Sequence, residues 1–190
     1  MQSRTIPAYY EGVSLEDTWT ALVNLSAGGS RGELFSFYPE PGNAGAKWRP
    51  SWGQLMTKPL PRYSGRSYMV DIDWNEEMEE DSCNAHCIEK GLVRGLAVVE
   101  GGDQHGELII ESKDGTEHVF DITAAHDYPI PEGTYTLICT HTVSYKDWVI
   151  RQRLLGERFE KMSVLQLCDE EEGGWLKDLH ISKKCRNILV

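Results

Sequence analysis

The sequence predicts a mainly β protein, α+β at the margin: an antiparallel β-sandwich or barrel with one N-terminal helix and a short C-terminal helix. Short runs rich in β-branched and aromatic residues recur between 67 and 168, and Gly, Pro or Asp-Gly turns separate them. Strands at such regular short spacing are typical of antiparallel architectures. The length of 190 residues and the 40% hydrophobic content are those of one folded domain, so we expect a single domain over 1–190.

The first expected element is an amphipathic helix over about 15–25. Ser14 is a favourable N-cap, and apolar residues recur after it at helical spacing, at Leu15, Trp19, Leu22 and Val23. Gly28 and Gly29 then end the helix.

An aromatic-rich segment with many Gly and Pro residues follows at 28–65. Pro and Gly disfavour long helices and central strands, so we expect irregular chain there. Its aromatic residues should pin it to the core; they include Phe35, Phe37, Tyr38, Trp48, Trp52 and Tyr63.

The β core is expected over 67–168. Its best-defined part is a hairpin between 107 and 122, because Asp114-Gly115 supplies the positive φ that a tight turn needs. Further strands are predicted at 67–74, 92–93, 96–99, 134–141, 148–153 and 159–168. A helix over 170–179, with Trp175 and Leu179 facing inward, and a strand at 187–190 complete the chain.

Composition excludes several classes of partner. The formal net charge of −11 would repel nucleic acid and anionic membranes. No apolar run is long enough to span a bilayer, and the first residues lack the apolar core of a secretory signal, so the expected location is cytoplasmic. There, the five cysteines are expected as reduced thiols. No glycine pair has the phosphate-binding pattern, and we expect no cofactor.

The loop from His126 to Pro131 is the first candidate site. His126 and Asp127 are adjacent titratable groups, followed by Tyr128 and rigid prolines, and they could act as general acid and base. The alternative is a turn in which Asp127 caps a backbone amide and His126 is solvated.

Cysteine and histidine pairs form the second candidate. Cys83, His86 and Cys87, together with Cys139 and His141, could supply soft ligands to zinc; the alternative is buried thiols and partly exposed imidazoles. Cys83 or Cys87 could also be a nucleophile activated by His86 or His126, although the neighbouring carboxylates raise a thiol pKa.

Acidic residues form a third candidate. Asp71 and Asp73 project to one side of a predicted strand and precede an acidic run at 76–81. They could attract a divalent cation, or they could belong to a solvated acidic loop.

Two short motifs resemble a known family. Arg49-Pro50-Ser51-Trp52 is similar to the Pro-Ser-Trp element of fungal heterokaryon-incompatibility (HET-domain) proteins, and the stretch 156–164 with terminal Leu189-Val190 is similar to their later strands. The resemblance takes in 91–96 and spans 48–190. It implies a C-terminal accessory region without the N-terminal HET region, to which incompatibility is attributed. Gln54 stands where that family usually has a second Trp.

These observations predict a non-catalytic interaction or regulatory module with a protein partner. It would carry an exposed apolar patch from Phe35, Trp48 and Trp52. The alternative is a small intracellular enzyme, for example one of secondary metabolism. It would bind a small molecule at the mouth of the β structure, with His126 and Asp127 as its acid and base.

Overall fold

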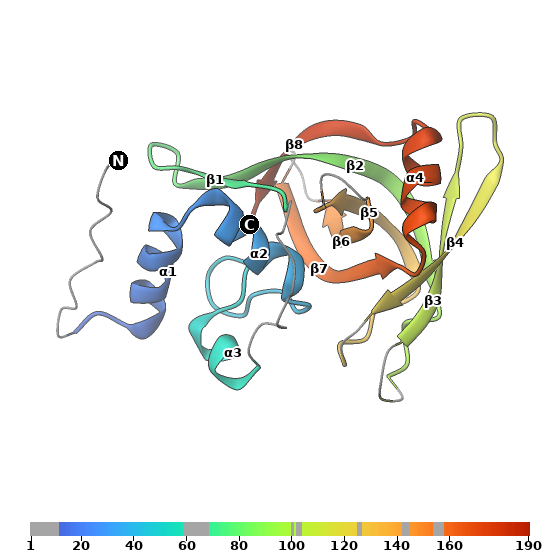
Figure 1. Ribbon diagram of the computed structural model, residues 1–190. Coiled ribbons are helices and arrows are strands. Elements are labelled where there is room, and N and C mark those ends of the chain that lie inside the picture. Colours follow the sequence, from blue (N-terminus) through green and yellow to red (C-terminus); the bar gives the residue numbers. More distant parts are fainter. Residues whose placement is uncertain are drawn as a thin grey trace.

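The fold is given by a computed structural model (Figure 1). The structure describes residues 12–58, 69–99, 101, 104–124, 127–141, 145–153 and 158–190. The helices in these residues are α1 (Leu15–Leu25), α2 (Gly28–Phe37), α3 (Trp52–Thr57) and α4 (Glu170–Asp178). The strands are β1 (Ile72–Asn75), β2 (Glu80–Arg94), β3 (Gln104–Glu111), β4 (Glu117–Ala124), β5 (Gly133–Cys139), β6 (Asp147–Arg153), β7 (Arg158–Leu167) and β8 (Lys183–Leu189).

Six of the strands close into an antiparallel barrel. The order is β2-β3-β4-β7-β6-β5, and β5 pairs back onto β2. The predicted mainly β, antiparallel fold with an N-terminal helix and a short C-terminal helix is therefore confirmed, as is the hairpin, in which Leu108 pairs with Phe120 and Gly115 has a φ of 85°. Among the described residues, no helix combines the length and apolar character needed to cross a bilayer.

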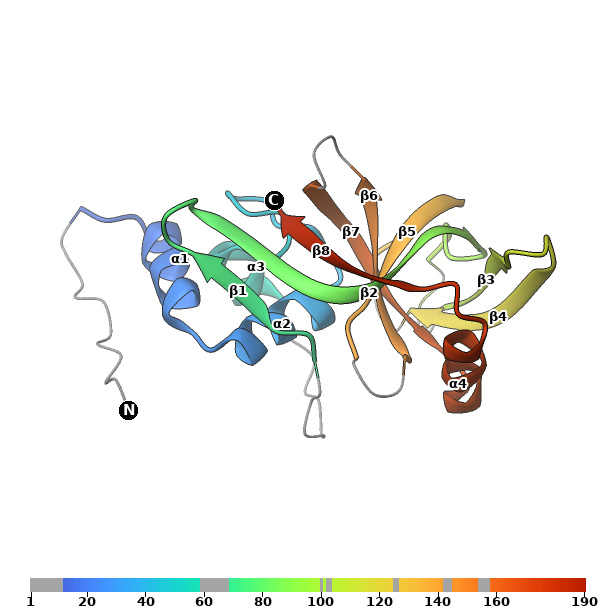
Figure 2. The same cartoon turned by 90° about the horizontal axis from the view of Figure 1, so that it is seen from above.

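Strand β2 joins two halves of the molecule (Figure 2). Its first half pairs with β1 and β8, and its second half pairs with β3 and β5. The pairing with β5 begins at Cys87 and shifts register between Ile88 and Gly91. The predicted strands at 92–93 and 96–99 were wrong in extent, since β2 already begins at Glu80 and 96–99 is not a strand. Cys83, Ala85 and Cys87 are buried in alternation, which is a pattern typical of a strand. It was overlooked because the two cysteines were interpreted as zinc ligands.

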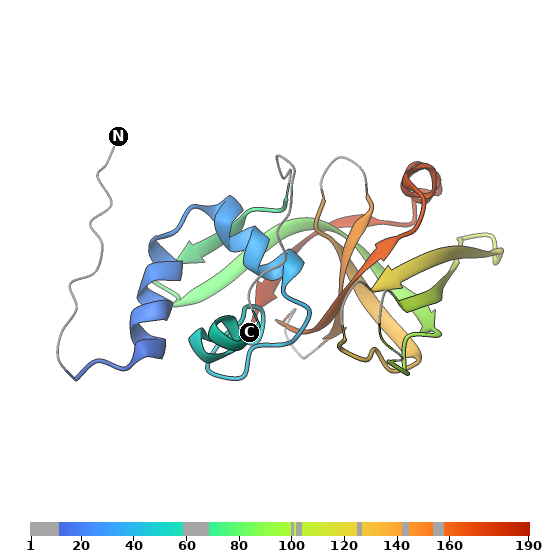
Figure 3. The ribbon, with the colours of Figure 1, turned by 60° about the horizontal axis from the view of Figure 1, so that its bottom comes forward.

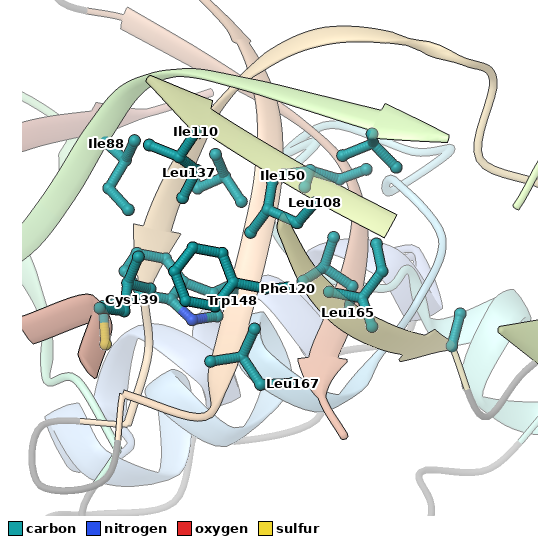
Figure 4. Packing of buried hydrophobic residues seen from close by; sticks show 14 of the residues in the cluster. Ile88, Leu108, Ile110, Phe120, Leu137, Cys139, Trp148, Ile150, Leu165 and Leu167 are labelled. Atoms are coloured by element: carbon teal, nitrogen blue, oxygen red, sulfur yellow. The ribbon is translucent and has the colours of Figure 1, made fainter. Parts of the chain in front are cut away.

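The barrel interior is filled with apolar side chains (Figure 4). Trp148 lies at its centre with aliphatic residues from all sides, including Leu108, Leu137, Ile150 and Leu165. A barrel of this few strands is narrow enough for side chains alone to fill it. Ligand binding must therefore use the outside of the barrel.

The N-terminal helices lie against the outer face of the sheet (Figure 3), and a second core of buried side chains lies between them. It includes Val23, Phe35 and Trp48 from the N-terminal half, packed on Ile138 and Val149. The expected irregular segment 28–65 thus contains α2 and α3, and the expected exposed patch is wrong, because Phe35 and Trp48 are buried and Trp52 is half-buried. The prediction that aromatic residues pin this segment to the core holds for Phe35, Tyr38 and Trp48.

Helix α2 forms despite its three glycines because it lies very close to the chain before β1. A Cβ atom at Gly32 would overlap the carbonyl of Val70, so only glycine allows this approach. At its other end, the buried Lys161 of β7 donates a hydrogen bond from Nζ to the carbonyl of Phe35 at 2.6 Å. The last carbonyl groups of a helix have no donor within the helix, and Lys161 supplies one to Phe35.

Helix α4 contacts the barrel through Leu176, which is fully buried in the barrel cluster. The prediction that Trp175 faces inward is wrong, since 62% of its surface is exposed. Leu179 is half-buried against the cluster, as predicted. The predicted inward face is displaced by one residue, from Leu176 to Trp175. A helix of nine residues has too few turns for its sequence to determine which face is buried.

Lys161 makes the stability of the fold depend on pH. Burial lowers the pKa of Lys161 from 10.5 to about 7. Between these values the unfolded chain binds the proton and the folded chain does not, so the free energy of unfolding rises with pH, by up to about 1.4 kcal/mol per pH unit. Below the pKa of the folded chain, Lys161 is charged in both states, and the buried charge then lowers the free energy of unfolding by its full amount.

We therefore expect Lys161→Met to remove a positive pH slope. Urea unfolding at a series of pH values between 7 and 8.5, compared with the parent chain, measures it. Lys184→Met, which removes an exposed lysine of β8, is the control and should keep the slope. Parallel stability curves for the parent chain and Lys161→Met would contradict the prediction.

Candidate functional site

The structure describes only one of the two residues predicted for acid–base chemistry. His126 lies outside the described residues, and Asp127 is exposed in the loop that leads to β5. This loop is held by the Ile130 N–H, which donates to the carbonyl of Leu96 at 2.8 Å. His141 follows the other end of β5 and is bridged to Met69. A strand of seven residues is about 23 Å long, so Asp127 and His141 lie at opposite ends of the barrel and form no common site.

The predicted zinc ligands also do not converge. Cys83 and Cys87 lie in the core beneath the helices, whereas Cys139 points into the barrel (Figure 4). The pairing of Cys87 with Ile138 explains this, because neighbouring residues in a strand project to opposite faces. His86 packs against Tyr145, with 5.4 Å between the ring centroids. Within the described ranges, no three His, Cys, Asp or Glu side chains are grouped to hold a metal.

The buried thiols are poor nucleophiles. Cys87 donates from Sγ to Oδ1 of Asn187 at 3.3 Å, and the Asn187 amide donates to the carbonyl of Cys83 at 3.5 Å. Burial raises the pKa of Cys83 to about 12 and that of Cys87 to about 11. It also raises the pKa of Cys139 to about 12. These groups are protonated at neutral pH and contribute packing and hydrogen bonds.

A carboxylate-rich cleft of about 540 Å³ is the best candidate site. It lies between α1 and the β1–β2 hairpin, with 44–46, Arg158 and 188–190 completing its wall. Figures 1 and 2 both show α1 beside the turn of this hairpin. Five carboxylates line the cleft, against two guanidinium groups, and they are Glu16, Asp17, Glu79, Glu80 and Asp81. The cleft therefore favours a cation.

One wall of the cleft is fixed by Arg49, which is buried. Its guanidinium donates to the Thr20 hydroxyl at 2.8 Å and pairs with Glu16 at 3.5 Å. Burial lowers the pKa of Arg49, and Glu16 opposes the effect. The other oxygen of Glu16 accepts from the Trp52 backbone N–H at 2.8 Å. Arg49 and Glu16 thus join α1 to α3, and their charges are balanced within the fold.

The base of the cleft is a buried ion pair. Asp81 pairs with Arg31 of α2 and accepts from the Trp48 indole N–H at 2.8 Å. Arg31 also donates to the carbonyl of Ile72 at 3.2 Å. Burial lowers the pKa of Arg31 to about 10, yet the group stays cationic at neutral pH. Glu80 pairs with Arg186 at 3.2 Å.

Asp17 and Glu79 are the carboxylates best placed to meet a ligand. Asp17 lies in the first turn of α1 and accepts from the Ser14 hydroxyl at 2.7 Å. Glu79 ends the hairpin turn with a φ of 49°, after the Asn75 side chain accepts from the Glu77 and Met78 backbone amides. Met78, 64% exposed, and the half-buried Trp74 add apolar surface on the same wall.

Sequence reasoning found the acidic run but interpreted it as a solvated loop. Residues 76–79 do form an exposed turn, whereas Asp81 is buried. Asp71 and Asp73 are both exposed. The cleft forms because α1 lies opposite the acidic run. These two segments are some sixty residues apart in the sequence, and no local pattern predicts that they meet.

Comparison with known proteins adds no relative: no family model, no curated protein and no solved structure matches this chain. The Pro-Ser-Trp element has a local structural role. Ser51 is the N-cap of α3, and Gln54 completes a reciprocal capping box with it. Gln54 therefore has a structural role in this fold.

The burial of the thiols predicts their reactivity. In the native chain, a water-soluble thiol reagent should modify Cys168 first, because it is exposed, and the half-buried Cys185 more slowly. Cys83, Cys87 and Cys139 should react only after unfolding, because a buried protonated thiol is neither accessible nor nucleophilic. Peptide mass mapping after timed labelling measures this order. Cys168→Ser is the control, and native labelling of Cys87 as fast as Cys168 would contradict the assignment.

Proposed function

We propose that this chain is a non-catalytic interaction module that binds a basic segment of a partner protein in the acidic cleft. The excess of carboxylates over guanidinium groups in the cleft carries the proposal. It agrees with the accessory role that the resemblance to incompatibility proteins implies, and it adds the chemistry of the partner.

The charges that remain available in the cleft support a cationic ligand. Glu16 and Asp81 are already paired with buried arginines, and Glu80 pairs with Arg186. Asp17 of α1 and Glu79 of the hairpin turn are the two other carboxylates of the cleft, and they outnumber Arg158, the guanidinium that lines it besides Arg49, so we expect a basic side chain of the partner to lie beside these two carboxylates. The net charge of −11 would steer a basic partner toward the surface before contact.

Apolar surface beside these charges supports a peptide rather than a simple cation. Met78 is flexible and polarisable, and such residues are common where a surface adapts to several partners. Trp74 offers a larger face for the stem of an Arg or Lys side chain. A segment with two or three basic residues around one aliphatic residue fits this combination.

Charge reversal in the cleft tests the proposal. The probe is the peptide Ac-Arg-Arg-Leu-Arg-Arg-amide, with affinity measured by isothermal titration calorimetry. Glu79→Lys should weaken binding roughly fivefold, the effect of about 1 kcal/mol for one exposed charge pair. Binding should also weaken between about 50 and about 300 mM salt, because these charges are screened.

Glu33→Lys is the matched control. It makes the same change in net charge on an exposed position of α2 that does not line the cleft, so affinity should change by less than about twofold. Equal losses for Glu33→Lys and Glu79→Lys would show non-specific attraction and contradict the proposal. Absence of binding to the parent chain would also contradict it.

A further inference from the structure

The outer edge of β4 is partly without a neighbouring strand. Within the described part of the chain, β4 pairs with β7 only through Ile122 and Thr123, although it pairs with β3 along its whole length. The hairpin arm formed by β3 and β4 extends beyond the barrel at this point, beside α4 (Figure 1). The edge from Glu117 to Phe120 therefore faces a groove.

The direction of the backbone groups on this edge follows from the hydrogen bond between Cys168 and Asp121, at the end of the open edge. The Cys168 N–H donates to the carbonyl of Asp121 at 2.9 Å, on the side of β4 away from β3. In a strand, the N–H and C=O groups of every second residue point to the same side. The backbone N–H and C=O groups of Val119 and Glu117 thus point into the groove. Such groups on an edge strand are available to pair with a further strand.

The groove itself has a volume of about 410 Å³ and is lined by 117–120 together with Trp175 and Leu179 of α4. Four consecutive strand residues can line one groove only along the strand's edge, since their side chains alternate between faces. Trp175 and Val119 are 62% and 56% exposed, respectively. An exposed tryptophan beside a groove is the kind of residue that dominates binding at interfaces.

One carboxylate lies beside this apolar surface on the open edge. Glu117 projects to the same face as Val119, and both are exposed. The open edge ends before Asp121, because Cys168 lies across from Asp121 and donates to its carbonyl. Opposite charges placed across from one another stabilise paired strands, so the matching segment has a basic residue two positions from an apolar one.

We propose that the open β4 edge binds an extended peptide as an additional antiparallel strand, with the pattern apolar–x–basic. The apolar residue exchanges two hydrogen bonds with the backbone of Val119, and its side chain packs on Trp175. The basic side chain lies beside Glu117. This site uses none of the cleft residues, so it stands or fails independently of the proposed function.

The test uses the intact chain and the peptide Ac-Leu-Thr-Lys-Thr-amide, titrated by calorimetry. Methylating the backbone nitrogen of Leu removes the donor to Val119 and should abolish binding. Methylating the adjacent Thr nitrogen, which points away from β4, should be tolerated. Trp175→Ala should weaken binding roughly tenfold or more, as loss of an aromatic anchor does.

On the protein side, Val119→Pro removes the groove-facing N–H and leaves the pairing with β3 intact, as proline on an outer edge can. It should lose binding, whereas Val119→Thr should retain it. The methylated peptides are titrated against the parent chain, so they test strand addition even if Val119→Pro fails to fold.

Several outcomes would overturn the proposal. Equal effects of the two methylations would exclude strand addition, and equal binding of a peptide with Glu in place of Lys would exclude the charge pattern. Absence of binding to the parent chain also counts against it. A dimer of the chain that Val119→Pro dissociates would mean that a second copy occupies the edge instead.

Discussion

The buried pair of Arg31 and Asp81 is the interaction on which the two halves of the molecule depend. It links α2 to the first half of β2, and Trp48 and the carbonyl of Ile72 satisfy further hydrogen bonds of the pair. Removing two charges from water is costly, and loss of one partner leaves an isolated buried charge. The position of the helices, and hence the acidic cleft with Asp81 at its base, follows from this pair.

The barrel acts as a filled scaffold, and both proposed binding surfaces lie at its periphery. Because Trp148 and its neighbours fill the interior, the usual ligand position in larger barrels is absent here. One surface arises where the β1–β2 hairpin extends past the barrel to meet α1. The other arises where the β3–β4 hairpin extends past β7 to meet α4. In both, a strand continues beyond its neighbours and a helix provides the opposite wall.

Local signals in the sequence predicted local structure well. Ser14 and the apolar spacing after it gave α1 its observed bounds, and Asp114-Gly115 gave the hairpin. Helix α2 was missed because Gly28, Gly29 and Gly32 argue against a helix, while the tertiary packing that requires Gly32 is invisible in sequence. The candidate sites failed to converge for the same reason: closure of the barrel, which separates Cys87 from Cys139, is a long-range property.

A double-mutant cycle on Arg31 and Asp81 tests the central claim most directly, using Arg31→Met, Asp81→Asn and the combined variant in urea unfolding. Each single change should cost about 3 kcal/mol or more, because it leaves the other charge buried and unpaired. The combined variant should cost at least about 2 kcal/mol less than the two single costs together. Costs that add to within about 0.5 kcal/mol would show that the pair does not act as a unit and would contradict this account.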